Sequence, residues 1–256
     1  MGQLVDGVWH PGWYEPDAKG SFVRPATRFR DRVTTVEPGR HHLYVSNACP
    51  WAHRTLITRS LRGLEQAVTI TTVDPRMSDD GWQFTEADPD PIFGARFLRD
   101  IYLRTNPRYT GRVTVPVLWD RVTNTIVNNE SREVMRMLDV DFASLAVNPH
   151  VPTLAPVELR RDIDHVLDAI YAPINNGVYR AGFAATQDAY VDAVRQLFEA
   201  LAHWDAILGD QPFTCGDLLT EADIALFTTL LRFDLVYYSH FKCNLRSARD
   251  HRNLWR

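Results

Sequence analysis

Apolar residues change their spacing along this chain near residue 157, and the change separates two kinds of structure. Before that point, short apolar runs bounded by Gly, Pro, Asp and Asn predict strands at 41–45, 67–73, 113–120 and 125–128. After it, apolar residues recur three and four positions apart, which predicts helices over 157–171, 187–208 and 221–238. The pattern therefore predicts a mixed α/β half followed by an all-helical half.

The order of elements narrows the fold of the first half. Helices expected at 50–61 and 131–138 turn the strands into a βαβ unit followed by two strands and a helix, the order of a thioredoxin-like domain. We expect an extended arm over 1–40, the thioredoxin-like domain over 41–140, a linker over 141–157 and the helical domain over 158–256. The stretch 74–112, rich in proline and acidic residues, is expected to be an irregular insertion.

Composition limits the partners and the cellular compartment that can be expected for this protein. The chain has 256 residues, 45% of them hydrophobic, and a formal net charge of −4, which argues against nucleic acid or an anionic membrane as the main partner. No secretory signal is expected in residues 1–20, and no segment resembles a membrane span. Three cysteines, an odd and sparse set, favour a reducing compartment over a disulfide framework, so a cytoplasmic location is expected.

Cys49 is the strongest candidate for chemistry. It follows the strand at 41–45 and precedes the helix that begins at Pro50, so its sulfur is expected at a helix N-terminus. Unpaired N–H groups and the helix dipole there stabilise a thiolate, although an ordinary thiol has a pKa of about 8.5. The competing interpretation is a buried cysteine that acts as a small hydrophobe.

The site is expected to hold one thiol. Ala52 stands where a Cys-x-x-Cys motif would have its second cysteine, so an external thiol must resolve any mixed disulfide, and glutathione is the abundant candidate. Pro116 within the strand run at 113–120 favours a cis Val115–Pro116 bond facing Cys49. The exposed N–H and C=O of Val115 could then pair with an extended tripeptide.

Several longer motifs resemble one family. The segments 45–54, 98–104, 127–131, 175–183, 219–224 and 240–246 are similar to the Xi class of glutathione transferases, the glutathionyl-hydroquinone reductases. The resemblance implies the glutathione transferase architecture, a homodimer, and reduction of glutathionyl-hydroquinones through a Cys49–glutathione mixed disulfide. Glutathione is then the co-substrate, glutathionylated quinols are the substrates, and no metal is needed.

The resemblance also implies roles for individual residues. Cys49 and Tyr179 would be catalytic. Glutathione-binding positions would be Trp82, Arg112, Val115, Pro116, Glu130 and Ser131, and the electrophile pocket would be lined by Pro50, Trp51, Tyr179, Tyr237 and Tyr238. Simpler interpretations stand beside these: a helix cap for Glu130 and Ser131, a hydrophobic anchor for Trp82, a solvated Arg112 and a core Tyr179.

Other functions remain open at this point. An Omega-like thiol transferase or dehydroascorbate reductase would use the same cysteine, and a binding or scaffold protein could have the same fold. Zinc held by Cys49, His53, His240 and Cys243 is a further alternative, but it would use up the thiolate. Family members continue past the segment equivalent to 253–256, so the resemblance implies a more open electrophile pocket if the chain ends at Arg256.

Overall fold

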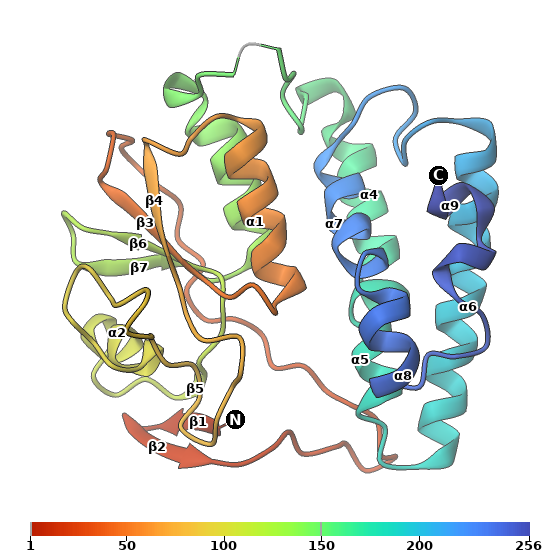
Figure 1. Cartoon of the computed structure of the whole chain (residues 1–256), viewed down its shortest axis with the longest axis horizontal. Helices are drawn as coiled ribbons and strands as arrows, with labels where there is room; N and C mark the ends of the chain where they lie inside the picture. The colour runs from red at the N-terminus through yellow and green to blue at the C-terminus, as the bar shows by residue number, and fades with distance from the viewer. Residues whose placement is uncertain (1, 149) are drawn as a thin grey trace. The chain divides into compact units, whose positions relative to one another are not determined.

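The computed structural model describes residues 2–148 and 150–256, so Met1 in the predicted arm and Pro149 in the predicted linker lie outside the described residues. The chain divides into two compact units. The first comprises the chain up to Trp13 together with Pro25–Pro152, and the second comprises Tyr14–Arg24 and Thr153–Arg256. Figure 1 shows the strands in the first unit and helices α4 to α9 in the second.

A four-stranded sheet organises the first unit. Its strand order is β4-β3-β6-β7, with bounds Val68–Thr72, His41–Val45, Val117–Asp120 and Thr125–Asn128. Strands β3 and β4 run parallel, and helix α1, Pro50–Leu61, connects them in the sequence. Strand β6 is antiparallel to both β3 and β7. The predicted thioredoxin-like order of elements is therefore confirmed.

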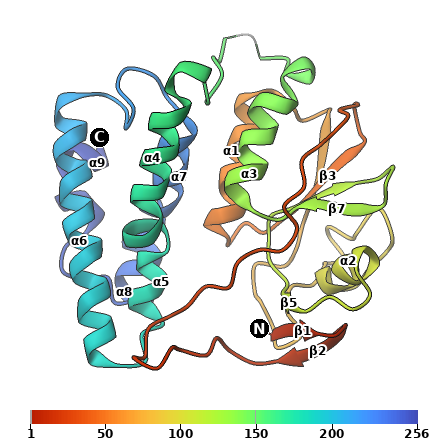
Figure 2. The same cartoon turned by 180° about the vertical axis from the view of Figure 1, so that it is seen from behind.

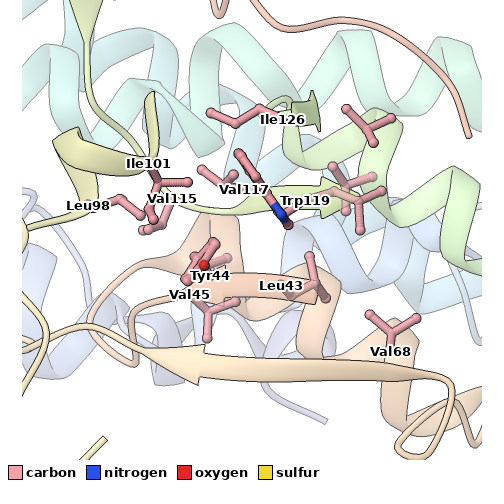
Figure 3. Packing of buried hydrophobic residues seen from close by; sticks show 14 of the residues in the cluster. Leu43, Tyr44, Val45, Val68, Leu98, Ile101, Val115, Val117, Trp119 and Ile126 are labelled. Carbon is pink, nitrogen blue, oxygen red and sulfur yellow. The ribbon is translucent and has the colours of Figure 1, made fainter. Parts of the chain in front are cut away.

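Every residue of the central strand β3 is buried, as expected of a strand with both faces covered. Helix α1 packs beside α3, Ser131–Arg136, as the view from behind shows (Figure 2). Helix α2, Leu98–Thr105, contacts β7. Figure 3 shows side chains from the four strands of this sheet, from α2 and from Val115 meeting in one hydrophobic cluster, whose members include Leu43, Tyr44, Val45, Val68, Leu98, Ile101, Val115, Val117, Trp119 and Ile126.

The extended arm expected over 1–40 begins with two short strands that the sequence analysis did not predict. Strands β1, Gly2–Val5, and β2, Val8–Pro11, form a hairpin, and β1 also pairs with β5, Gly111–Arg112. The two-residue turn is Asp6-Gly7, with positive φ angles of 48° and 81°, which these residue types tolerate well. The hairpin and β5 make a second, three-stranded sheet.

Two expectations for the middle of this unit are also corrected. The insertion contains helix α2, whose N-terminus has a capping box with Asp100 and whose Leu98, Ile101 and Tyr102 are buried on one face. The strand expected over 113–120 joins the sheet only at Val117, because Pro116 has no N–H to donate to a ladder. The Val115–Pro116 peptide bond is cis, as predicted.

The second unit is helical, as predicted, with different helix limits. Its longest helices are α4, Arg160–Ile170, α6, Gln187–Asp210, and α7, Glu221–Leu230. The helix expected over 221–238 ends at Leu230. At this end, Arg232 Nη1 donates to the carbonyl of Thr228, which is one of the acceptors left open where a helix stops. The remaining elements are η3 Val157–Leu159, η4 Tyr171–Asn175, α5 Gly177–Gly182, η5 Phe233–Tyr237, α8 Tyr238–His240, η6 Ala248–Asp250 and α9 Arg252–Trp255.

Two further departures concern irregular helical turns. Helix α3 ends at Arg136 and continues as the π-helical turn η1, Met137–Asp141, rather than as an α-helix to residue 138. Within the expected linker, residues Ala143–Leu145 form the 3₁₀ turn η2. A capping box formed by Thr220 and Asp223 stands at the start of α7.

Candidate active site

Cys49 is the N-cap residue of α1. Its backbone is extended, with φ −89° and ψ 117°, and its Sγ accepts a hydrogen bond from the N–H of Ala52 at 3.5 Å. The Cys49 carbonyl accepts from His53 N–H at 3.0 Å and so begins the helical ladder. The thiol is partly exposed and lies where the helix presents its N–H groups, the environment that favours a thiolate.

The backbone at the cis-proline reaches the same sulfur. Cys49 Sγ lies 3.5 Å from the carbonyl oxygen of Val115, to which the protonated thiol donates. Tyr102 on α2 fixes the residue before Val115: its hydroxyl donates to the Thr114 carbonyl at 2.8 Å and accepts from the Thr114 N–H at 3.1 Å. Asn129 Nδ2 donates to that hydroxyl at 3.0 Å. Helix α2 therefore helps to position the segment before the cis-proline, which faces the cysteine.

A polar chain of contacts connects α1 to the start of α3. The Arg54 guanidinium lies 4.4 Å from the centre of the Trp51 ring, and its Nη1 donates to the Ser131 hydroxyl at 3.5 Å. Ser131 Oγ lies 3.5 Å from Glu130 Oε1, and Thr27 Oγ1 donates to Glu130 Oε2 at 3.2 Å. Glu130 is also the N-cap residue of α3 and accepts from Arg132 N–H. A cation, two hydroxyls and a carboxylate thus lie together at this helix start.

The other two predicted glutathione positions have different surroundings. Trp82 is partly buried against the hydrophobic cluster, and its carbonyl accepts from Leu98 N–H at 3.0 Å. The Arg112 guanidinium donates to three backbone carbonyls, those of Gly2 at 3.0 Å, Gly12 at 3.1 Å and Trp13 at 2.6 Å. These bonds tie Arg112 to the N-terminal hairpin, and its role toward glutathione stays a prediction.

The helical unit contains an aromatic cluster around Tyr179. The hydroxyls of Tyr179 and Tyr237 lie 3.5 Å apart, and the rings of both contact Phe241. Tyr237 is 2% exposed and therefore buried, whereas its neighbour Tyr238 is 38% exposed and open to solvent. The Arg24 guanidinium lies 4.6 Å from the centre of the Tyr179 ring, and its Nε donates to Asn176 Oδ1 at 2.7 Å. A phenol and a cation are therefore adjacent in this unit.

Sequence reasoning assigned no role to Arg54 or Arg24. Arg54 had a signal, because it lies four residues from each of the buried Pro50 and Thr58 on α1, where an uncharged residue is the usual choice. Arg24 is distant in sequence from the helix it contacts, so no local pattern could have placed it.

The remaining cysteines are unlike Cys49. Burial raises the pKa of Cys243 to about 12, and this residue is fully buried. Burial also raises the pKa of Cys215, although its side chain is partly exposed. Among residues 2–148 and 150–256, no group of three or more His, Cys, Asp or Glu side chains is arranged to hold a metal ion. None of the helices in the same ranges is long and apolar enough to cross a membrane.

Comparison with known proteins decides the family. Residues 48–140 match the Glutathione S-transferase, N-terminal domain family, and residues 159–256 match the Glutathione S-transferase, C-terminal domain family. The chain is 46% identical to glutathionyl-hydroquinone reductase PcpF of Sphingobium chlorophenolicum, over 100% of this chain and 83% of that protein. The solved structure of a Xi class GST from Natrialba magadii superposes with a TM-score of 0.92 at 50% identity, covering 100% of this chain and 80% of that one. This chain is a Xi-class glutathione transferase.

A further solved relative of this Xi-class transferase contains the tripeptide. The glutathione-bound structure of YqjG from Escherichia coli K-12 superposes with a TM-score of 0.86 at 46% identity, covering 99% of this chain and 82% of that one. The two-part fold of this Xi-class chain, a mixed-sheet N-terminal half and a helical C-terminal half, is thus the fold of the glutathione transferases.

Proposed function

We propose that this Xi-class transferase is a glutathione-dependent glutathionyl-hydroquinone reductase that acts through Cys49. The observation that carries the proposal is the position of Cys49 Sγ, 3.5 Å from the Ala52 N–H donor at the helix start and 3.5 Å from the Val115 carbonyl. A thiolate formed there is stabilised by the helix end, and it lies beside backbone groups suited to an extended tripeptide. Both the stabilised thiolate and the neighbouring backbone groups serve a reaction in which the Cys49 sulfur attacks the sulfur of bound glutathione.

The reaction has two steps, and its atoms balance. The Cys49 thiolate attacks the glutathione sulfur of the aryl thioether, so an S–S bond forms and the aryl C–S bond breaks. The electron pair of that bond goes to the aryl carbon, which takes up a proton, and the free hydroquinone leaves. A second glutathione thiolate then attacks the glutathione sulfur of the mixed disulfide, which releases the Cys49 thiolate and oxidised glutathione.

The binding roles follow from the charges at each place. We assign the γ-glutamyl end of glutathione to Ser131 and Glu130, because the helix N–H groups and hydroxyl can accept a carboxylate while the Glu130 carboxylate pairs with an ammonium group. Val115 pairs with the cysteinyl part, beside Pro116, and Trp82 and Arg112 complete the proposed glutathione contacts. For the hydroquinone we propose Pro50 and Trp51 together with the tyrosines at 179, 237 and 238. The Tyr179 hydroxyl can hydrogen-bond a quinol oxygen or help to protonate the carbon.

The test compares cysteine variants on the predicted substrate. Glutathionyl-menadiol and excess glutathione are mixed with the wild type, Cys49→Ser and the matched control Cys215→Ser, and hydroquinone release is followed by chromatography. We expect turnover with ping-pong kinetics in the wild type and in Cys215→Ser, and none in Cys49→Ser. Mass spectrometry of the wild type treated with substrate alone should find one glutathione attached to Cys49.

Two other results would redirect the proposal. If the wild type exchanges disulfides or reduces dehydroascorbate but releases no hydroquinone, it is an Omega-like thiol transferase. If it is inactive in both assays while folded, it is a binding protein on this fold. Loss of activity in Cys215→Ser equal to that in Cys49→Ser would contradict the assignment of the nucleophile.

We further propose that the protein acts in the cytoplasm as a homodimer. The free thiols at 49, 215 and 243 are consistent with a reducing compartment, where glutathione is abundant. Sedimentation velocity of the full chain tests the second part: a species of twice the chain mass supports it, and a monomer at micromolar concentration contradicts it.

A further inference from the structure

The N-terminal hairpin contacts two segments to which the proposed function assigns glutathione, and it is not part of either. On one side, β1 pairs with Gly111 and Arg112, four residues before Val115 and Pro116. On the other side, Trp9 of β2 contacts the residues immediately before Trp82. The hairpin therefore connects two binding segments that are about 30 residues apart in the chain.

Trp9 packs closely against the turn that precedes Trp82. Trp9 Nε1 donates to the Asp79 carbonyl at 3.0 Å. Gly81 has φ +82°, and a Cβ added there would lie 2.9 Å from the Trp9 ring, so only glycine lets the ring lie against this turn. The Arg99 guanidinium lies 5.1 Å from the centre of the Trp9 ring, and it also donates to the Asp80 carbonyl.

Residues beyond Trp82 are fixed by separate bonds. The Trp82 carbonyl accepts from Leu98, and Gln83 and Phe84 are bonded to Asp74 and Arg96 through the backbone. On the N-terminal side of Trp82, the turn is closed by the Gly81 N–H bond to the Ser78 carbonyl at 3.0 Å, and Trp9 and Arg99 tie this turn to the hairpin. Without Trp9, the turn Ser78–Gly81 would lose the ring that packs on it and the donor to Asp79.

The hairpin is itself anchored by Arg112, shortly before Val115, whose backbone is proposed to pair with glutathione. Three bonds from the Arg112 guanidinium, to the carbonyls of Gly2, Gly12 and Trp13, hold both ends of the hairpin. The position of Trp9 therefore depends on Arg112, which lies three residues before Val115.

We propose that Trp9 is a positioning residue for glutathione binding, holding the Ser78–Gly81 turn so that Trp82 is presented to the tripeptide. The proposal rests on the proposed function, since it takes Trp82 as a glutathione contact. Trp9 does not touch the reacting sulfurs, so its loss should weaken glutathione binding much more than it slows the chemical step.

The experiment uses the full chain with Trp9→Ala, Trp9→Phe and the control His10→Ala, whose exposed side chain follows on the same strand. We expect KM for glutathione to rise about tenfold in Trp9→Ala with kcat at saturation within about threefold of wild type, an intermediate KM in Trp9→Phe, and no change in His10→Ala. Gly81→Ala, which displaces the same ring from the opposite side, should raise KM similarly. Amide hydrogen exchange over 78–84 should accelerate in Trp9→Ala.

The outcomes separate the two proposals. An unchanged KM in a folded Trp9→Ala, or an equal fall in kcat and kcat/KM, would overturn the positioning role while leaving the reductase intact. If Trp9→Ala fails to fold, Trp9→Phe and Gly81→Ala decide by the same KM criterion. Wild type that neither binds S-methylglutathione nor turns over would overturn the proposed function, and the positioning role with it.

Discussion

Arg54 Nη1 and the Ser131 hydroxyl lie 3.5 Å apart, a contact that joins the interior of α1 to the first residue of α3. Arg54 is 3% exposed, and its guanidinium also lies over Trp51. One buried cation therefore contacts a proposed glutathione residue and a proposed electrophile-pocket residue at the same time.

Replacement of Arg54 should affect both stability and binding. Arg54→Met keeps the stem but removes the hydrogen bond and the cation–π contact, so we expect a loss of about 1–3 kcal/mol in the free energy of unfolding. KM for glutathione should rise several-fold because the Ser131 hydroxyl loses a donor. Urea unfolding and steady-state kinetics check both, and Arg54→Lys should recover part of each. Wild-type stability in Arg54→Met would contradict the structural role given to the contact.

Tyr102 should matter through its hydroxyl. Tyr102→Phe leaves the Thr114 N–H and the Asn129 side-chain amide without a buried acceptor, so the free energy of unfolding should fall by about 1–3 kcal/mol. Because Thr114 precedes Val115, kcat/KM should fall as well. Tyr238→Phe, at a more exposed position, is the stability control and should unfold like the wild type. Equal denaturation midpoints for the two variants would refute this prediction.

Asp120 should make stability depend on pH in the acid range. Burial acts to raise the pKa of its carboxyl, but hydrogen bonds from Arg40, Val122 and Thr123 outweigh burial and hold that pKa well below its ordinary value. A group with a lowered pKa stabilises the fold above its unfolded pKa, so this stability is present above about pH 4 and is lost as the pH falls further. Unfolding of Asp120→Asn should therefore vary less with pH below 4 than unfolding of the wild type.

The control for that measurement is Glu86→Gln, at an exposed carboxylate. Its pH dependence should match the wild type. If Asp120→Asn shows the same acid dependence as the wild type, the Arg40 pair is not its source.

Two glycines of α5 should respond oppositely to alanine. A Cβ at Gly182 would lie 2.2 Å from Phe241 Cδ1, and Phe241 packs against Tyr179 and Tyr237, so Gly182→Ala should destabilise by about 1–3 kcal/mol. At Gly177 the nearest atom is 3.4 Å away, so Gly177→Ala should be neutral or slightly stabilising. Thermal unfolding compares the two. With hydroquinone substrate, Gly182→Ala should also raise KM for the quinol more than KM for glutathione.

Alkylation should distinguish the three cysteines. Iodoacetamide at pH 7 should modify Cys49 first, Cys215 slowly and Cys243 only after denaturation, because burial raises the pKa of Cys243 to about 12 and removes it from solvent. Peptide mass spectrometry over time gives the three rates. Faster labelling of Cys215 than of Cys49 in the native protein would count against the helix N-terminus as the activating feature.

The parts of the fold that could be predicted are those with local signals. Strand 125–128 and helix 50–61 have the predicted limits, because Pro50 favours the first helical turn and a polar turn precedes the strand. The N-terminal hairpin was missed although Asp6-Gly7 is a strong turn signal, since its strands have only four residues each and β2 is largely exposed. Helix α2 was missed because prolines around it suggested an irregular insertion.

The candidate site was predictable where function follows from backbone position. Cys49 and Val115 could be placed together because a helix N-terminus and a proline before a strand have fixed geometry in this fold. The partners of Arg54 and Arg112 could not be predicted. Their side chains reach residues about 75 and 100 positions away, so these contacts depend on tertiary packing and leave no periodic pattern.

The path of the chain also decides how this protein can be divided. Tyr14–Arg24 belongs to the helical unit, where Gly20 and Lys19 bond to Ala185 and Thr186, yet the first unit continues on either side of this segment. A gene fragment that starts at residue 153 would therefore lack a piece of its own fold, including the cation over Tyr179. After a proteolytic cut near residue 150, the N-terminal fragment would still contain Tyr14–Arg24, which belongs to the helical unit. The two transferase domains of this enzyme follow one another in the sequence. The helical unit nevertheless needs a segment from the N-terminal part of the chain, so the two domains cannot be exchanged by a single cut between them.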